Sequence, residues 1–406
     1  MSSQWRNSTP VVVGCSQTRL GKLKKPLSAL VAEAVEAALR DAGIDAGRLD
    51  GIVAMPALAT DKSRPLRLME AHQIATDLGL LTRAGGQDMV CKTIDCGGAS
   101  PVAALREACS LIDEGTCACV AVVGADAVAS MTTTDFLERV SGNRNGSRPI
   151  IPEKYDDFAQ WHAQTHGTTR EDLARVPVFM SAQASCNANA MAYGKKVLDV
   201  GDVLRAPRVA PSTTLLECAR RADGAAVLIV ADGRQMASAR GVPILGTGEA
   251  SGPMNPDQSY VGAHCLRPIG VAAQRALERS GALRADEIDW FGLYDCFPVA
   301  FLSALEHVGL APMGKGGAWV RDALKRLERG EKINVNTHGG LLGAGAPWEA
   351  PAMFAIVEAV MQLRGEAGPR QVGRVRTALV QANGGTFSHE AVVVLGRKEH
   401  AQKAKL

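Results

Sequence analysis

The chain has 406 residues, enough for two or three domains, and its composition of 46% hydrophobic residues, 42 glycines and few aromatics is typical of an α/β protein. Its formal net charge of +3 is too close to neutral to favour a nucleic acid or an anionic membrane as a partner. No apolar run approaches the roughly 20 residues of a membrane span, and the N-terminus lacks a secretory-signal pattern, so we expect a cytoplasmic protein.

Two segments of the chain, residues 31–55 and 271–295, follow the same pattern of helix, glycine, acidic loop and strand. In both, an Ala/Leu-rich helix is predicted to end at a glycine, Gly43 in the first segment and Gly281 in the second. Glycine just past the last helical residue is a common helix stop. The sequence therefore predicts an internal repeat.

A second, looser correspondence joins residues 95–126 with residues 338–385, where a glycine turn leads into a helix and then a strand. Strands that alternate with helices predict largely parallel sheets covered by helices. We expect two halves, residues 1–240 and 241–406, with a ligand site between them. A more polar stretch, about residues 125–215, is predicted to be an insertion that folds over the N-terminal half.

In the first half, Cys96 stands where a predicted strand gives way to a helix, in the stretch IDCGGASPVAALREA. The free N–H groups and the dipole of a helix N-terminus favour a thiolate, and the glycines allow a substrate carbonyl to approach the backbone. The alternative is that Cys96 is one more small buried residue, as free cysteines often are.

The chain has ten cysteines, but no set of Cys and His residues has the spacing of a zinc site, so no metal is predicted. Cys117 and Cys119 lie in an apolar run that is predicted to be a buried strand. In the insertion, His162 and His166 are one helical turn apart, which suits metal ligands but is interpreted as ordinary surface histidines. Thr168 or Thr169 is predicted to cap the next helix.

After the insertion, a turn is predicted at Asp223-Gly224, followed by a strand over residues 225–231. In the second half, Tyr294, Asp295 and Cys296 follow the strand of the second repeat. Residues just outside strand carboxyl ends line clefts in open α/β folds. A carboxylate that caps a helix beside a core tyrosine and cysteine would give the same pattern, so both interpretations stay open.

Two glycine-rich loops come next. NVNTHGGLLGAGAP (334–347) contains His338, a candidate base because imidazole titrates near neutrality, although a structural histidine would look the same. This loop does not fit a nucleotide-binding fingerprint. QANGGTFSHEAVVVLG (381–396) is predicted either to supply backbone donors to an oxyanion or to form a tight hairpin.

In this order, and over nearly the whole chain, the cysteine turn, the insertion and the DGAA, YDCF, NTHGG and NGG motifs resemble the thiolase superfamily. The similarity is greatest to the sterol-carrier-protein-type thiolases and their thiolase-like relatives. The resemblance implies an α/β fold in which two βαβαβαββ halves form a five-layer αβαβα sandwich, with a loop insertion from the first half. It also implies a homodimer, coenzyme A as part of the substrate, and no bound cofactor.

The resemblance assigns roles to individual residues. Cys96 falls on the family's nucleophile, and Cys296 falls on the cysteine of the HDCF motif, which is the acid/base for the carbon fragment. Tyr294 replaces the histidine of that motif, and Ala346 replaces the histidine of the GHP motif, which normally activates the nucleophile. Ala382 replaces the cysteine that other thiolases carry in CxG.

Loss of the GHP histidine matters because a general base typically contributes about 10²- to 10⁴-fold in rate. His338, eight residues upstream of Ala346, is the nearest candidate to replace it. The candidate substrate and oxyanion residues are Asn336, Gly339, Gly384 and Gly385.

Three functions are compatible with these residues. The one we predict is an acyl-CoA C-acyltransferase that cleaves or forms a C–C bond in a 3-oxoacyl-CoA through a Cys96 acyl-enzyme, on a branched or aromatic acyl group. The alternatives are a retro-aldol lyase that acts on a 3-hydroxyacyl-CoA with Tyr294 as acid/base, and a non-catalytic subunit. The resemblance also implies a small zinc-ribbon/OB-fold companion subunit, because relatives without the full histidine set often work with one.

Overall fold

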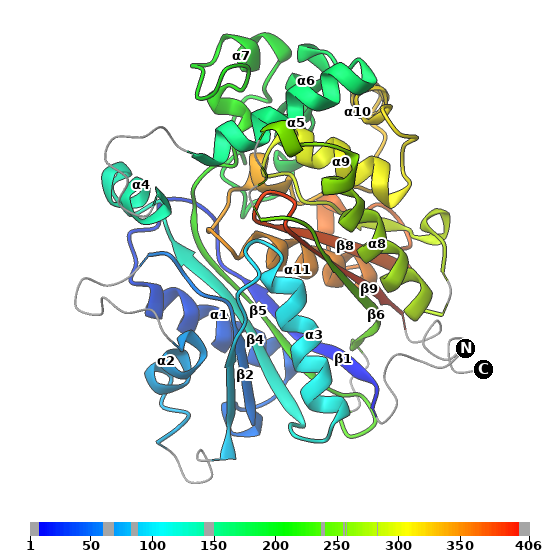
Figure 1. The fold of residues 1–406 in the computed structure, drawn as a ribbon. Helices are drawn as coiled ribbons and strands as arrows, with labels where there is room; N and C mark the ends of the chain where they lie inside the picture. Colours follow the sequence, from blue (N-terminus) through cyan, green and yellow to red (C-terminus); the bar gives the residue numbers. More distant parts are fainter. Residues whose placement is uncertain are drawn as a thin grey trace.

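The strands form one nine-stranded sheet in the order β3-β2-β4-β5-β1-β6-β9-β8-β7 (Figure 1). The computed structural model describes residues 8–59, 69–82, 88–141, 150–236, 240–254, 256, 258–281 and 283–397. The strands of the first half-sheet are β1 (Pro10–Gln17), β2 (Gly51–Ala54), β3 (Val90–Thr93), β4 (Cys119–Ala127) and β5 (Asp223–Asp232). Those of the second are β6 (Val242–Ser251), β7 (Trp290–Gly292), β8 (Thr377–Gly384) and β9 (His389–Gly396).

The two half-sheets repeat one topology about the β1–β6 contact. From that contact outward, the first half runs β1, β5, β4, β2, β3 and the second runs β6, β9, β8, β7. The pairings also repeat, since β2–β4 and β7–β8 are parallel whereas β1–β5, β4–β5, β6–β9 and β8–β9 are antiparallel. In the second half a single bridge between Phe291 and Val335 takes the place of the outermost strand.

The repeat extends to single residues. The first strand of each half has a register irregularity before a glycine, Gly14 in β1 and Gly246 in β6. Each glycine lies so close to the covering helix that a Cβ would collide with its backbone, at Ala38 and at Ala276 respectively. The covering helices, α1 (Leu27–Ala42) and α8 (Ala263–Arg279), end before the predicted glycines, which confirms the internal repeat.

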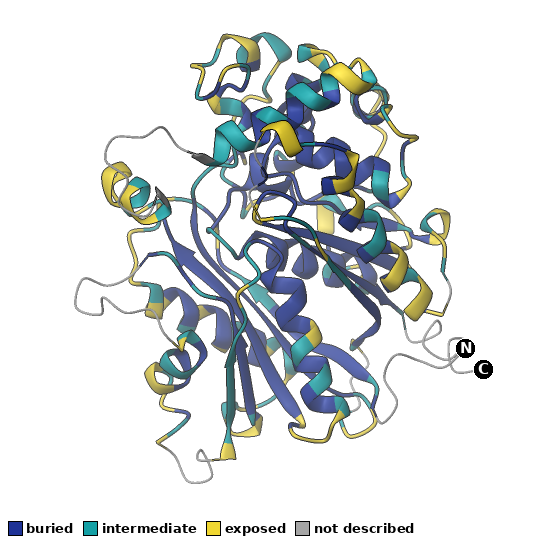
Figure 2. Cartoon of the chain, viewed as in Figure 1, coloured by how far each residue is buried: buried dark blue, intermediate teal, exposed yellow. Residues whose placement is uncertain are grey.

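Helices lie on both sides of each half-sheet, as a five-layer sandwich requires (Figure 1). Helix α1 packs on β1, β4 and β5, α2 (Glu70–Asp77) packs on β2 and β3, and α8 packs on β6 and β9. Between the half-sheets, α3 (Ser100–Asp113) and α11 (Pro351–Arg364) contact each other and strands of both halves. The strands and these two central helices are largely buried, whereas the outer helices expose one face (Figure 2). The predicted fold class is confirmed.

The described residues between β4 and β5 include the α-helices α4 (Thr133–Ser141), α5 (Ile150–His166), α6 (Arg170–Ala184) and α7 (Val200–Arg205). Thr169 caps α6, and its side chain and that of Asp172 form a reciprocal capping box, as the sequence predicted. Helices α5 and α6 pack against α9 (Pro298–Val308), and α6 also packs on α10 (Gly316–Glu328). The insertion therefore covers helices of the C-terminal half, and the prediction that it folds over the N-terminal half is wrong (Figure 1).

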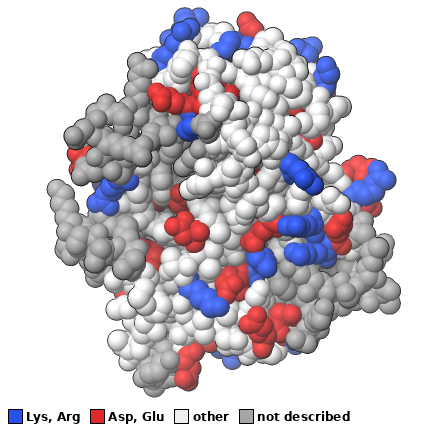
Figure 3. Space-filling view, in the orientation of Figure 1, with Lys and Arg blue, Asp and Glu red and all other residues white. Residues whose placement is uncertain are grey.

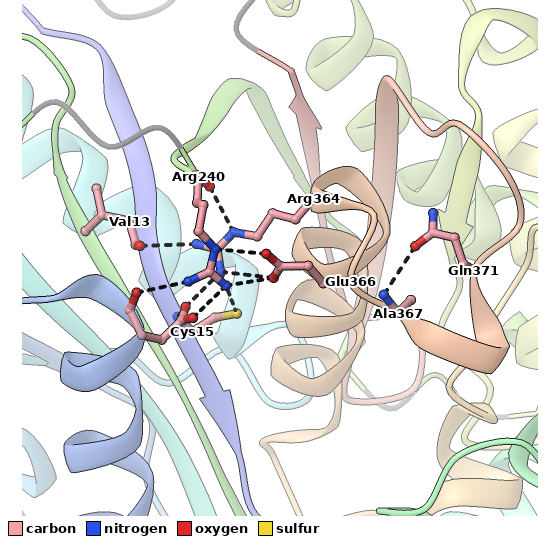
Figure 4. A network of polar contacts seen from close by, with 8 residues as sticks. Val13, Cys15, Arg240, Arg364, Glu366, Ala367 and Gln371 are labelled. Atoms are coloured by element: carbon pink, nitrogen blue, oxygen red, sulfur yellow. Dashed lines mark hydrogen bonds and ion pairs between the residues drawn. The ribbon is translucent and has the colours of Figure 1, made fainter.

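A buried arginine joins the two halves at the end of α11 (Figure 4). Arg364, only 3% exposed, donates to the Val13 carbonyl at 3.1 Å, to Asp41 Oδ2 at 2.7 Å and to the Arg240 carbonyl at 2.9 Å. Arg240 in turn makes a two-point ion pair with Glu366, with both N···O distances 2.8 Å. These contacts fix the C-terminal end of α11 against β1 and α1.

One local prediction is wrong. Asp223 and Gly224 begin strand β5 instead of forming a turn before it. Asp223 is fully buried, and its carboxylate accepts hydrogen bonds from the Leu23 and Ser130 amides, which explains why an aspartate is stable there.

Two features concern the surface. No helix in the described ranges is long and apolar enough to cross a bilayer. On the face shown in Figure 3, Lys and Arg side chains are interspersed with Asp and Glu side chains instead of being separated by sign.

Candidate active site

Cys96 lies in a tight turn between β3 and α3, where the sequence placed it. Its side chain is partly exposed, and its backbone N–H donates to Ser100 Oγ at 2.8 Å. Gly97 has φ +60°, a conformation that favours glycine, and Pro101 stands in the first turn of α3. Because the Cys96 N–H is already bonded, it is not a free donor for a substrate oxyanion.

Glycines allow the C-terminal half to approach this turn closely. A Cβ on Gly98 would collide with the Tyr294 hydroxyl and the Asn383 carbonyl, and a Cβ on Gly384 would collide with the Cys96 carbonyl. A Cβ on Gly97 would lie 2.9 Å from the Gly385 nitrogen. The Cys96 turn, Tyr294 and the β8–β9 hairpin therefore meet at one place, as the two-half prediction requires.

Tyr294 and its neighbours are held by buried amides. The Tyr294 N–H donates to Gln381 Oε1 at 2.9 Å. The Asp295 carboxylate accepts from the Leu341 and Leu342 amides at 2.8 and 3.1 Å, so Asp295 anchors the loop that follows NTHGG. Burial raises the pKa of Asp295 to about 7, although these two amides oppose the shift. Tyr294 itself is 6% exposed, and burial raises its pKa well above the usual range.

The pKa values of the Cys96 and Cys296 thiols are raised, whereas an activated cysteine usually has a lowered pKa. Burial raises the pKa of Cys96, and the carboxylates of Glu249 and Asp95 raise it further. Burial also raises the pKa of Cys296, and the carboxylates of Asp295 and Glu390 raise it further. The charged groups that shift the Cys96 pKa are both carboxylates, so they oppose ionisation of this thiol.

Two further residues of the site, Tyr155 and Asn383, were missed by sequence reasoning. Tyr155 comes from α5 of the insertion, and its hydroxyl donates to the Gly385 carbonyl at 2.8 Å. Asn383 Nδ2 donates to the same hydroxyl at 2.8 Å. The sequence signal was weak: Tyr155 belongs to an aromatic cluster in the insertion, and Asn383 precedes the double glycine.

The predicted donors Gly384 and Gly385 lie in the hairpin between β8 and β9. The Ser388 amide donates to the Gly384 carbonyl at 3.0 Å and so fixes the Gly384–Gly385 peptide plane. The Gly385 nitrogen lies close to Gly97, and its N–H makes no hydrogen bond to any residue that the structure describes. Gly385 remains a candidate oxyanion donor, and the prediction of a tight hairpin is confirmed as well.

Asn336 and Gly339 do not fit the role predicted for them. The Asn336 side chain is completely buried, accepts from the Leu293 N–H at 2.7 Å and donates to the Leu293 carbonyl at 2.7 Å. The Gly339 N–H donates to the Asn336 carbonyl at 2.8 Å. The Asn336 side-chain amide and the Gly339 N–H both donate to backbone carbonyls of the protein, so neither is free to bind a substrate oxygen.

His338 is buried on the side of Trp290, with the two ring centroids 6.5 Å apart. Burial lowers its pKa to about 4, and Glu358 and Arg370 are the charged groups that act on it. Its Nδ1 has no hydrogen-bond partner among the described residues. These contacts do not connect His338 to Cys96, so its role as the base of Cys96 stays a prediction.

Ala346, at the position of the GHP histidine, is buried and bonded through its backbone to Arg220 and Ala222. Three residues later, Glu349 lies within electrostatic range of Asp95 and Tyr294. Burial, together with nearby carboxylates, raises the pKa of Glu349 to about 8. Glu349 therefore carries a proton near neutral pH beside the Cys96 turn.

The interpretation of His162 as a surface histidine is wrong. His162 is 1% exposed, and its Nδ1 and Nε2 lie 2.7 Å from Thr168 Oγ1 and 3.2 Å from Glu306 Oε2. It joins the insertion to α9. The helical spacing of histidines did not distinguish a buried structural residue from an exposed one.

Known proteins resemble this chain over most of its length. The family model described as "Thiolase C-terminal domain-like" matches residues 259–397. Acetyl-CoA acetyltransferase of Methanothermobacter thermautotrophicus is 29% identical over 397 residues, which cover 95% of this chain and 99% of that protein. Sterol carrier protein 2 of Bos taurus is 31% identical over 245 residues, 57% of this chain and 43% of that protein, so the match spans less than half of that relative.

Benzoylsuccinyl-CoA thiolase subunit BbsB of Thauera aromatica is 28% identical over 266 residues, 64% of this chain and 66% of that protein. Among solved structures, the Ltp2-ChsH2(DUF35) aldolase superposes with a TM-score of 0.79 at 24% identity, over 96% of this chain and 99% of that one. A monomeric SCP2-thiolase-like protein type 1 from Mycobacterium smegmatis has a TM-score of 0.69 at 21% identity, over 98% and 78% of the two chains.

Proposed function

We propose that this chain, which is similar to an acetyl-CoA acetyltransferase over most of its length, is a thiolase-like acyltransferase that cleaves or forms a carbon–carbon bond in a 3-oxoacyl-CoA through a Cys96 acyl-enzyme. The observation that carries the proposal is the convergence of three segments. The Cys96 turn touches both the Tyr294 hydroxyl and the hairpin at Gly384, although these residues are nearly 200 or more positions apart in the chain.

The residues at the site can divide the reaction between them. The Cys96 thiolate attacks the 3-oxo carbon, and the Gly385 N–H stabilises the oxyanion that forms. The bond between C2 and C3 then breaks, and the acyl-CoA enolate takes a proton from the Cys296 thiol. A second CoA attacks the Cys96 thioester and returns its thiol proton to Cys296, so both sulfurs recover their starting state.

Ionisation of Cys96 is the difficult step, because burial and two carboxylates raise its pKa above the usual range. A base within reach typically contributes about 10²- to 10⁴-fold. We therefore expect slow turnover of simple substrates by the isolated chain. The acyl group we propose is branched or aromatic, in keeping with the benzoylsuccinyl-CoA thiolase relative.

The position of Tyr294 favours a second candidate, a retro-aldol lyase that acts on a 3-hydroxyacyl-CoA. Its hydroxyl lies directly against Gly98 and its pKa is raised, so Tyr294 stays protonated and can donate to the enolate that leaves when C2–C3 breaks. The 3-hydroxyl proton would go to an ionised carboxylate. Burial raises the pKa of Glu349 to about 8, so Glu349 would accept this proton only in its ionised fraction. The structural similarity to an aldolase agrees with this candidate.

We also propose partners and a location. The solved aldolase is named for two components, and BbsB is named as a subunit. A companion subunit with a zinc ribbon and an OB fold, a homodimer of this chain, and a cytoplasmic location follow as expectations from the resemblance to thiolases.

Labelling and substitution distinguish these functions. Under the acyltransferase proposal, iodoacetamide labels Cys96, acetoacetyl-CoA protects it, and Cys96→Ala abolishes thiolysis of acetoacetyl-CoA by free CoA. The exposed Cys186 is the control, because its labelling should not respond to acetoacetyl-CoA and Cys186→Ala should keep activity.

If Cys96→Ala retains cleavage of a 3-hydroxyacyl-CoA whereas Tyr294→Phe loses it, the lyase replaces the acyltransferase. If neither variant changes any CoA-dependent turnover, and no acyl group is found on Cys96 by mass spectrometry, the chain is a non-catalytic subunit. The same assays with the companion subunit added would test whether that partner is required.

A further inference from the structure

Tyr155 is the only tyrosine of the described insertion that reaches the site. It lies on α5, is 3% exposed, and stacks on Phe297 with ring centroids 4.4 Å apart and planes inclined by 18°. Its ring also packs edge-on against Phe387, with centroids 5.4 Å apart. Tyr193, in a later turn of the insertion, is half exposed instead.

The Tyr155 hydroxyl uses its full hydrogen-bonding capacity on catalytic segments. A phenol has one donor and two acceptor positions. The Tyr155 hydroxyl donates to the Gly385 carbonyl at 2.8 Å and accepts a hydrogen bond from Asn383 Nδ2 at 2.8 Å. Cys296 is its third partner. One oxygen from the insertion therefore joins the hairpin to the thiol that we propose as acid.

The hairpin needs such support because part of its backbone is strained. Phe387 has φ +59°, which is uncommon for a residue with a bulky side chain. Its N–H donates to Asn383 Oδ1 at 3.2 Å, and its ring, 1% exposed, packs against Tyr155 and Phe158 of α5. Two aromatic residues of the insertion thus hold the turn that presents the Gly385 N–H to Gly97.

We infer that Tyr155 is a positioning residue through which the insertion sets the Gly385 oxyanion donor and the proton of Cys296. The expected change in kcat rests on the proposed C–C bond chemistry. The expected change in hydrogen exchange rests only on the geometry of the hairpin. Movement of α5 would displace both groups together, so the state of the insertion would control turnover.

Tyr155→Phe tests this inference, because it keeps the ring contacts and removes only the oxygen. We expect kcat for acetoacetyl-CoA thiolysis to fall about 10- to 100-fold with KM changed less than about threefold, since the lost contacts act after binding. Tyr193→Phe is the matched control and should change neither kcat nor KM.

Hydrogen exchange followed by mass spectrometry gives a second readout that does not need turnover. Tyr155→Phe should speed exchange in a peptide covering residues 383–388, and Tyr193→Phe should not. A kcat within twofold of the parent protein would overturn the inference. If the parent protein has no turnover at all, the proposed function fails separately, and unchanged exchange at 383–388 would then overturn the positioning role.

Discussion

The Cys96 turn and the Tyr294–Cys296 segment bring the two halves of the molecule together, but they are built in opposite ways. The turn is partly exposed, is formed by glycines, and has the carboxylates of Asp95 and Glu249 near its sulfur. The Tyr294–Cys296 segment is buried, is held by amide groups and by Tyr155, and has the carboxylates of Asp295 and Glu390 near its sulfur.

The two regions are held in position by different kinds of contact. The Cys96 turn is positioned by backbone contacts so close that a single methyl group does not fit, whereas the Tyr294–Cys296 segment is positioned by side chains from several elements. Burial and nearby carboxylates raise the pKa of both thiols, so both regions disfavour the thiolate.

The largest expected effect is at the contact between the Cys96 turn and the β8–β9 hairpin. In Gly384→Ala, the new Cβ would collide with the Cys96 carbonyl, a backbone atom that cannot rotate away. We expect a loss of roughly 100-fold or more in activity, and a loss of about 1–3 kcal/mol in the free energy of unfolding. Gly47→Ala, at a position with open space around it, is the control for kinetics and urea unfolding. A fully active Gly384→Ala protein would show that the Cys96 turn and the hairpin are not in contact.

The next effect concerns the NTHGG loop that supports the Tyr294–Cys296 segment. Burial lowers the pKa of His338 to about 4 in the folded protein, so the unfolded chain binds a proton at a higher pH than the folded chain does. The contribution of His338 to the free energy of unfolding is complete above pH of about 6.5 and is lost as the pH falls towards about 4. The loss is on the order of 2 kcal/mol at pH of about 5.

His338→Gln should remove this dependence, so the difference in urea midpoint between the two proteins should shrink or reverse on acidification. Equal pH dependence in both proteins would mean that His338 is solvated, contrary to its position beside Trp290.

A smaller effect is expected inside the Cys96 turn. Ser100→Ala removes the oxygen that accepts the Cys96 N–H and leaves that donor without its partner. We expect a loss of about 1–2 kcal/mol in unfolding free energy, with activity reduced by about tenfold. Ser110→Ala, in the same helix and partly exposed, should be close to neutral by both measurements. If both variants behave alike, the turn does not depend on Ser100.

The smallest effect concerns the carboxylates near the sulfur of the Cys96 turn. Glu249→Gln removes a carboxylate that raises the pKa of Cys96, so iodoacetamide should label Cys96 about two- to threefold faster near neutral pH. The partly screened position of Glu249, paired with Arg106, keeps the change small. Glu278→Gln on α8 is the control, and a slower reaction in Glu249→Gln would reverse the assigned sign of the electrostatic effect.

Local patterns were sufficient for much of the architecture and for part of the site. The glycine stops at Gly43 and Gly281, the Thr169 cap and the turn at Cys96 each depend on residues within a few positions of one another. Asp223 was misread because its partners, Leu23 and Ser130, lie far away in the sequence.

The sequence by itself determined the duplicated α/β plan, the order of the helices and strands, and the position of the cysteine turn, because helix ends and strand periodicity are set by near neighbours. Only the tertiary structure decided that Asn336 and Gly339 support the backbone, that His338 and His162 are buried, and that Tyr155 reaches the hairpin. Those outcomes depend on contacts between residues up to 230 positions apart, and such contacts form only when the two halves and the insertion pack together.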